Sequence, residues 1–185
     1  YAGEQAKTTI REKNWAVIVE GYMDAIAAHQ FGFKNVVASM GTSLTEIQVS
    51  TLTRMANRIS LALDSDAAGQ EATLRSLKSS WQAIYSGVHP FKGNKKQRHL
   101  RGSPQQNVDV VVMPAGEDPD NLIRKNPNLW AELLESTKPF LDYMMESEVS
   151  RINIDAPGSR ALVVEEFRNL LVTADFMDQD RYVRK

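Results

Sequence analysis

The stretch Trp15–Asp24, with the sequence Trp-Ala-Val-Ile-Val-Glu-Gly-Tyr-Met-Asp, decides the fold of this chain. Its first five residues form an apolar run that ends abruptly at Glu20 and Gly21. This pattern is typical of a buried parallel strand whose carboxyl end opens into a turn. Residues 22–30 then have the composition of a helix. A buried strand, a turn and a helix in this order predict an α/β fold with a parallel sheet.

The same order of elements recurs along the chain. Three further strands are predicted, at residues 35–38, 58–63 and 108–113. Ser43 and Glu46 have the spacing of a capping box for a helix that runs to about Ala56, and another helix is expected over residues 67–85. Because strands alternate with helices, we expect right-handed crossovers and a parallel sheet of about four strands with helices on both faces.

Only helical patterns follow residue 126. They cover about residues 129–136, 139–149 and 159–172. We therefore expect an α/β domain over residues 1–126 and an α-helical subdomain over residues 127–185, truncated at its carboxyl end. Residues 86–107 are rich in glycine, proline and basic residues and lack apolar periodicity, which indicates a basic loop inserted in the first domain.

Composition restricts the class of protein. A hydrophobic content of 42% and a charged content of 24% are ordinary for a globular protein. The chain has no cysteine, so disulfides and thiolate zinc sites are excluded and no zinc is expected. No apolar run approaches the roughly 18 residues that span a bilayer, so we expect a soluble, intracellular protein without a membrane partner. The chain begins at Tyr1 rather than at Met, and we expect it to be part of a longer protein.

Three pairs of acidic residues follow predicted strands. They are Glu20 with Asp24, Asp64 with Asp66, and Asp118 with Asp120. The carboxyl ends of parallel strands meet at one edge of a sheet, so we expect the three pairs to meet there. Two carboxylates about 4 Å apart repel by roughly 4 kcal/mol at an effective dielectric near 20, so either protonation or a bound cation must relieve the repulsion. Oxygen ligands favour Mg²⁺, with Mn²⁺ as a substitute, over zinc.

The residues themselves suggest roles at this edge. We predict that Asp64, Asp66 and Asp118 bind metal, next to a phosphorylated substrate. Glu20 is followed by Gly21, which allows close approach of a substrate backbone, and could either activate a 3′-hydroxyl as a general base or help to hold a metal. The alternative is that each acidic residue only caps a helix or marks a turn. That explains one pair well, but not three pairs at three strand ends.

Two further groups of residues are weaker candidates. Gly41 and Thr42 follow the second strand, where they could bind a phosphate or simply form a tight turn. The basic residues of the inserted loop could contact template phosphates: Lys92, Lys95, Lys96, Arg98 and Arg101. Since no aromatic residues are interleaved with them for base stacking, a solvated loop is the favoured interpretation.

Four motifs in order resemble the Toprim domain of bacterial DnaG-type primases. They are Glu-Gly-Tyr-Met-Asp at 20–24, Val-Ala-Ser-Met-Gly-Thr at 37–42, Asp-Ser-Asp-Ala-Ala-Gly at 64–69 and Gly-Glu-Asp-Pro-Asp at 116–120. The first and last together separate primases from topoisomerases, recombination-repair proteins and small Toprim nucleases. The likeness runs from about Trp15 to Lys125. The helices after it resemble, more loosely, the helical subdomain that follows Toprim in these primases.

The resemblance implies a role for each acidic residue. Glu20 and Asp64 would be catalytic, and metal would be held by Asp64, Asp66 and Asp118, with Glu20 as a further ligand. Asp24 and Asp120 would support them, together with Gly21, Gly41 and Thr42. Ser65 departs from the pattern, since many members have glycine there.

The resemblance also implies an activity. The protein would be a DNA-directed RNA polymerase of the primase type, a nucleotidyltransferase that makes RNA primers from ribonucleoside triphosphates on single-stranded DNA during replication. It would act at the replication fork in the bacterial cytoplasm, as part of a primosome whose helicase binds a region outside this chain. Because the family's zinc-binding and amino-terminal parts are not found before Trp15, we expect the isolated chain to bind metal but to make primers poorly or not at all.

Two alternatives remain from the residues alone. One is a Toprim nuclease that uses the same ions to cleave phosphodiesters. The other is a non-catalytic docking module for nucleic acid or protein, in which the acidic edge has lost its role.

Overall fold

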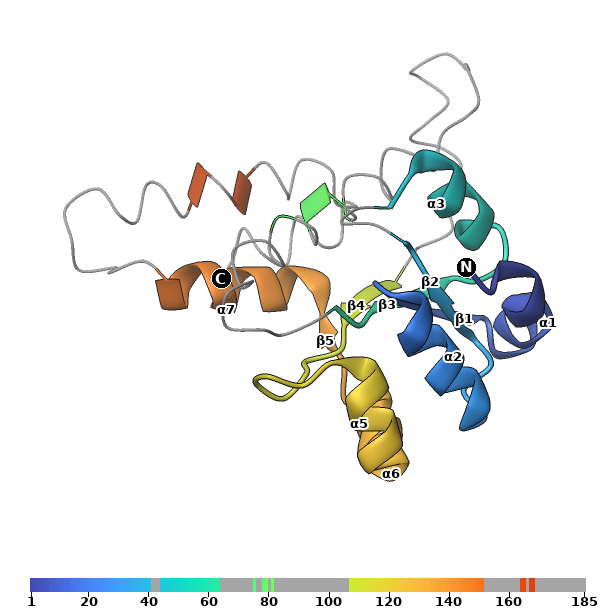
Figure 1. The fold of residues 1–185 in the computed structure, drawn as a ribbon. Coiled ribbons are helices and arrows are strands. Elements are labelled where there is room, and N and C mark those ends of the chain that lie inside the picture. The colour runs from blue at the N-terminus through green and yellow to red at the C-terminus, as the bar shows by residue number, and fades with distance from the viewer. Residues whose placement is uncertain are drawn as a thin grey trace, which may run out of the picture. The chain divides into compact units, whose positions relative to one another are not determined.

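Two compact units make up the structure, Tyr1–Lys138 and Pro139–Lys185. Figure 1 shows this computed structural model, which describes residues 1–40, 44–63, 75, 78–79, 81, 107–151, 164–165 and 167–168. The boundary between the two units lies twelve residues after residue 126, where we expected the α/β domain to end. The reason is that helix α6 (Pro127–Glu135) packs on the helix before it and so belongs to the first unit. The Toprim boundary at residue 126 stays a prediction.

A five-stranded sheet forms the centre of the fold, in the order β2-β1-β3-β4-β5. The strands are β1 (Trp15–Val19), β2 (Val36–Ala38), β3 (Arg58–Leu61), β4 (Asn107–Val110) and the two-residue β5 (Lys138–Pro139). The pairs β1–β2, β1–β3 and β3–β4 are parallel. This confirms the predicted parallel sheet, and β1 is found at the residues expected for it.

Strand β1 is buried on both faces, as its apolar sequence predicts. Val17 and Val19 belong to a core cluster that also contains Ala25 of helix α2 (Tyr22–Gln30). Ile18 points to the other face of the sheet, since side chains alternate along a strand. It lines a pocket of about 780 Å³ bounded by helices α1 (Gly3–Lys13) and α3 (Glu46–Thr53). Helices therefore cover both faces of the sheet.

Helix α3 corrects one detail of the sequence prediction. Its cap is Thr45, whose Oγ1 accepts a hydrogen bond from the Gln48 backbone N–H at 3.3 Å. The Gln48 Oε1 accepts in turn from the Thr45 N–H at 2.9 Å. The observed capping box is therefore formed by Thr45 and Gln48, two residues later than the predicted pair of Ser43 and Glu46, of which Ser43 lies outside the described residues. Both pairs have the same spacing, so the sequence pattern alone does not choose between them.

Helix α1 was not expected from the sequence. Most of its residues are polar, and its only buried side chains are Ala6 and Ile10, which lie four residues apart on one face. It ends at Asn14, which adopts a left-handed conformation with a φ of 50°. Asparagine is a common residue at such a position.

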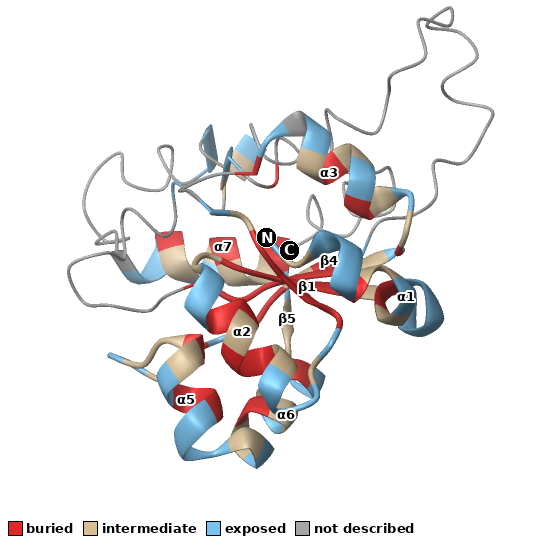
Figure 2. Ribbon diagram, turned by 45° about the vertical axis from the view of Figure 1, so that its right-hand side comes forward, coloured by how far each residue is buried: buried red, intermediate tan, exposed pale blue. Residues whose placement is uncertain are grey.

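Helices α2, α5 (Pro119–Lys125) and α6 pack together on one face of the sheet. Figure 2 shows buried residues, in red, on all three helices where they lie together. Trp130 of α6 is fully buried and meets Phe33 edge to face, with ring centroids 6.4 Å apart. This packing brings the start of α5, and the acidic residues before it, to the start of α2.

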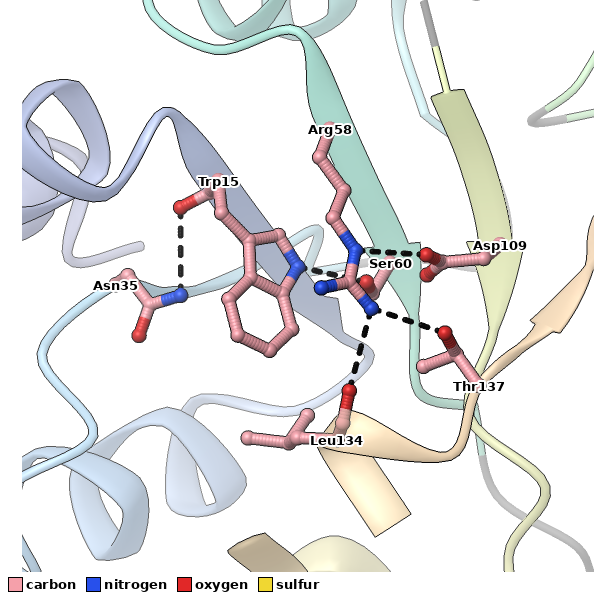
Figure 3. Close-up of polar contacts among 7 residues, drawn as sticks. All are labelled: Trp15, Asn35, Arg58, Ser60, Asp109, Leu134 and Thr137. Carbon is pink, nitrogen blue, oxygen red and sulfur yellow. Dashed lines mark hydrogen bonds and ion pairs between the residues drawn. The ribbon is translucent and has the colours of Figure 1, made fainter. Parts of the chain in front are cut away.

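A polar network ties the strands together at their amino ends (Figure 3). The Arg58 guanidinium donates from Nε to Asp109 Oδ2 at 2.8 Å and from Nη2 to the Thr137 hydroxyl at 3.0 Å and the Leu134 carbonyl at 3.3 Å. It also stacks on the Trp15 ring, with Cζ 4.0 Å from the ring centroid.

Two more hydrogen bonds extend this network. The Trp15 indole N–H donates to the Ser60 hydroxyl at 2.7 Å, and Asn35 Nδ2 donates to the Trp15 carbonyl at 3.3 Å. Both Ser60 and Asn35 are buried. The network therefore joins β1, β3, β4 and the segment after α6.

Residues 164–165 and 167–168 are helical, within the helix expected over residues 159–172. The last helix with defined bounds is α7 (Phe140–Arg151), in the second unit. It covers the helix expected over residues 139–149. Within the described residues, no helix has both the length and the apolar character needed to cross a bilayer.

Candidate active site

Glu20 lies at the carboxyl end of β1, where β2 continues alongside it. The Ser39 N–H donates to the Val19 carbonyl at 3.0 Å, and the Met40 N–H donates to the Glu20 carbonyl at 3.1 Å. Met40 then turns the chain with a φ of 63°, a conformation that is uncommon for residues other than glycine. The backbone of Glu20 is therefore fixed by sheet-like pairing beyond the end of the strand.

Gly21 begins helix α2 as its N-cap, and Asp24 is the third helical residue. Asp24 Oδ2 accepts a hydrogen bond from the Gly21 N–H at 3.0 Å. The same carboxylate accepts a second hydrogen bond, at Oδ1, from the Asp120 N–H at 3.1 Å. Asp24 is only 7% exposed. Its carboxylate thus joins two segments that lie 96 residues apart in the sequence.

The surroundings of Asp24 raise its pKa above the ordinary value of 3.8. Burial is the largest cause, and the negative charges of Asp118 and Asp120 act in the same direction. The hydrogen bonds from Gly21 and Asp120 oppose both effects. The contributions of Asp118 and Asp120 show that two other negative charges lie near this carboxylate.

Asp118 caps helix α5, as the sequence predicts. Its Oδ1 accepts from the Asn121 N–H at 2.7 Å and its Oδ2 accepts from Asn121 Nδ2 at 2.9 Å, and Pro119 occupies the first helical turn. Asp118 is partly exposed, so its carboxylate can also face a ligand.

Two basic residues of α5 pair with acidic residues beside Asp118. Arg124 Nε donates to Asp120 Oδ1 at 2.8 Å, and Lys125 Nζ donates to Glu117 Oε1 at 2.9 Å. Both cations lie on the helix that follows the acidic residues, one or two turns along. Among the described residues, the side chain of Asp118 instead accepts hydrogen bonds from the two nitrogens of Asn121 and pairs with no cation.

The structure brings together part of the predicted site. Asp24, Asp118 and Asp120 are neighbours, and Gly21 links them to Glu20. The other predicted residues lie outside the described part of the chain: Gly41, Thr42, Asp64, Asp66, Lys92, Lys95, Lys96, Arg98 and Arg101. Strand β3, which precedes Asp64 and Asp66, lies between β1 and β4 in the sheet.

Within the described residues, no three histidine, aspartate or glutamate side chains are grouped closely enough to hold a metal. The predicted ligand set depends on Asp64 and Asp66, which are not among those residues. The donors that are described are carboxylate oxygens, the type that hard divalent cations prefer. The negative charges of Asp118 and Asp120 near Asp24 also suit a cation. The carboxylates therefore fit a divalent metal, with Asp118 and Glu20 as the candidate ligands among the described residues.

The fold and these carboxylates define a Toprim-like α/β domain, and residues 17–95 match the family described as Toprim-like. The DNA primase of Clostridium acetobutylicum is 31% identical over 170 residues, which are 91% of this chain and 25% of that protein. The chain contains the Toprim domain of the bacterial DnaG-type primases. It spans about a quarter of the length of the curated relatives that it matches.

Solved structures agree with this assignment. The structure of the DnaG catalytic core has a TM-score of 0.75 and 26% identity, covering 100% of this chain and 54% of that chain. The DnaG primase catalytic domain bound to single-stranded DNA has a TM-score of 0.73 and 25% identity, with coverage of 100% and 54%. Toprim primases typically use divalent metal ions.

Proposed function

We propose that this chain is the Toprim part of the catalytic core of a DNA primase, which makes RNA primers on single-stranded DNA during replication. The observation that carries the proposal is the hydrogen bond from the Asp120 N–H to Asp24. It brings the Glu-Gly-Tyr-Met-Asp and Glu-Asp-Pro-Asp motifs, distant in sequence, to one edge of the sheet. The likeness to the DnaG catalytic core over the whole chain supports it.

Asp64, Asp66 and Asp118 would hold Mg²⁺, or Mn²⁺ in its place, with Glu20 as a further ligand or as the base. Such an ion, when bound, stabilises negative charge on the reacting phosphate and orients the substrate. Asp118 suits this role because its backbone is fixed at the start of α5 while its side chain is partly exposed. No zinc is proposed for this chain.

Glu20 would act on the primer end of the substrate. The 3′-hydroxyl of the growing RNA attacks the α-phosphate of the incoming ribonucleoside triphosphate, and pyrophosphate leaves. As a general base, Glu20 would take the proton of that hydroxyl. Gly21 beside it presents no side chain, so the substrate can approach the turn closely.

The partners of the whole enzyme follow from the same proposal. They are the single-stranded DNA template, ribonucleoside triphosphates, the RNA primer and a replicative helicase that binds outside this chain, at the replication fork in the bacterial cytoplasm. Gly41 and Thr42 would bind phosphate, and the basic residues between Lys92 and Arg101 would contact the template. We also propose that residues 1–126 form the Toprim domain and residues 127–185 a helical subdomain, and that the isolated chain is weakly active or inactive.

The test is primer synthesis by the full-length enzyme carrying Asp118→Asn. Asparagine is as good an N-cap as aspartate, so α5 should stay capped while a ligand charge is lost. We expect primer synthesis to fall about 100-fold or more with an unchanged melting temperature. Wild-type rates would contradict the proposal. Cleavage of labelled DNA or RNA without added nucleotides would indicate a nuclease instead, and a chain that binds no Mn²⁺ would favour a docking module.

A further inference from the structure

Asp24 differs from Asp118 in its burial and in the segments that its oxygens contact, since both oxygens of Asp118 accept hydrogen bonds from Asn121 alone. Each of its two carboxylate oxygens accepts a backbone N–H, one from Gly21 and one from Asp120. The side chain is almost fully buried, whereas Asp118 is partly exposed. A ligand of Mg²⁺ must bring an oxygen to about 2.0–2.1 Å from the ion, which needs an accessible lone pair. The geometry of Asp24 therefore suits a different role from that of Asp118.

We propose that Asp24 is a positioning residue that fixes the Glu20 turn (residues 20–21) relative to the Asp118 loop (residues 116–120), and that it is not a metal ligand. The first hydrogen bond fixes the residue directly after Glu20. The second fixes Asp120, two residues after Asp118. The distance between the two acidic side chains is thus constrained through the backbone on either side of one buried carboxylate. This inference rests on the proposed function only for its effect on Mn²⁺ binding.

A carboxylate is required at this position for a simple reason of chemistry. It accepts hydrogen bonds at both oxygens, while the asparagine side chain offers one acceptor and one N–H₂ group. In Asp24→Asn the side-chain NH₂ group, which is a donor, would face the backbone N–H of either Gly21 or Asp120. One of the two contacts should therefore be lost, although the shape of the side chain is unchanged.

The absence of a side chain at Gly21 gives a second, independent variant. Its φ of −96° is open to any residue, so the turn itself does not demand glycine. A Cβ at Gly21 would lie 3.0 Å from Asp24 Oδ2, which is tighter than most real Cβ contacts, so the carboxylate must shift by a few tenths of an ångström. Gly21→Ala should therefore displace the Asp24 carboxylate without changing Asp24 itself. Gly3→Ala is the matched control, because a Cβ there meets nothing within 4 Å.

The first measurement is amide hydrogen exchange of this chain by NMR, in the absence of metal and nucleotides. We expect the Asp120 or Gly21 amide to exchange at least tenfold faster in Asp24→Asn, and the Asp120 amide to exchange faster in Gly21→Ala. Gly3→Ala should leave both amides at the wild-type rate. Wild-type exchange of both amides in Asp24→Asn and Gly21→Ala would overturn the proposal. Because no metal is present, this result is independent of whether the protein is a primase.

The second measurement is Mn²⁺ binding by the same variants. We expect Asp24→Asn and Gly21→Ala to weaken binding about three- to tenfold with unchanged stoichiometry, and Asp118→Asn to weaken it more. Ser60→Ala is the control for a general loss of stability, because Ser60 lies in β3 and bonds to Trp15 rather than to either acidic segment. Loss of a bound ion in Asp24→Asn with both amides still protected would identify Asp24 as a ligand and overturn the proposal. Equal weakening in Ser60→Ala would also overturn it.

Discussion

Charged side chains at the two ends of the sheet have opposite kinds of surroundings. At the amino ends of the strands, Arg58 lies between an aspartate, a carbonyl, a hydroxyl and an aromatic ring, so its positive charge meets complementary groups. At the carboxyl ends, the charges that act on Asp24 are those of Asp118 and Asp120, and its hydrogen-bond donors are backbone amides. The first arrangement stabilises the fold. The second groups three carboxylates near one another, an arrangement that suits binding of a divalent cation.

The sharpest test of this difference is to neutralise a carboxylate at the carboxyl end. In the full-length enzyme, Glu20→Gln should lower primer synthesis about 10²- to 10⁴-fold, because a positioned base or ligand is lost. The melting temperature should change little, since the amide keeps the size of the side chain. The measurement is incorporation of labelled ribonucleotides together with a thermal melt. Normal synthesis in this variant would show that the acidic edge is not the reactive part.

The opposite result is expected at the amino end. Arg58→Ala should lower the free energy of unfolding by about 3 kcal/mol, because the Asp109 side chain, which is only 14% exposed, is left without its cation. Arg58→Lys should lose less, since it keeps the charge but not the forked geometry. Urea unfolding gives both values. Mn²⁺ affinity of the folded Arg58→Lys variant should equal that of the wild type, and a large loss would mean that the two ends are coupled.

A smaller effect is expected within the same network. Ser60→Ala removes the acceptor of the Trp15 indole N–H and should cost about 1–2 kcal/mol in the free energy of unfolding. Ser136→Ala is the matched control, because its hydroxyl bonds to the Glu132 carbonyl at an exposed helix end. That change should stay within about 0.5 kcal/mol. Equal values for the two variants would show that the buried bond adds nothing.

The smallest predicted effect concerns pH. Because the pKa of Asp24 is raised in the folded state, that state takes up a proton at a higher pH than the unfolded chain does. The free-energy penalty for burying the ionised Asp24 carboxylate is fully present above the folded-state pKa. It is relieved as the pH falls through that pKa toward 3.8. The stability of the wild type relative to Asp24→Asn, measured without metal, should therefore rise as the pH is lowered. A constant difference between the two would contradict this linkage.

The elements that the sequence predicts well are those with local signals. Strand β1 and helix α2 are found at the expected residues. Both are predicted from a local pattern, an apolar run that ends shortly before a glycine. The cap at Asp118 is equally local, since Pro119 follows directly. Helix α1 was missed because its two buried residues give too short an apolar pattern in a polar segment.

The features that the sequence leaves open depend on partners far along the chain. Arg58 and Asp109 can be recognised in the sequence as charged residues in apolar strands. Their pairing cannot be predicted from neighbouring residues, because it depends on the register of β3 and β4. Likewise, Asp24 was expected only to support the site, and its bond to Asp120 depends on how α2 packs on α5.

The alternation of the first four strands with helices, the placement of Glu20 and Asp118 after strands, and the resemblance to a family were thus determined by the sequence alone. Local side-chain periodicity and short motifs are enough for these, because each is set by residues within one element or turn. The tertiary structure alone decided which carboxylate is buried between two backbone amides and which arginine joins the strands at the other end. Those choices depend on packing between segments that fold together only in the complete domain.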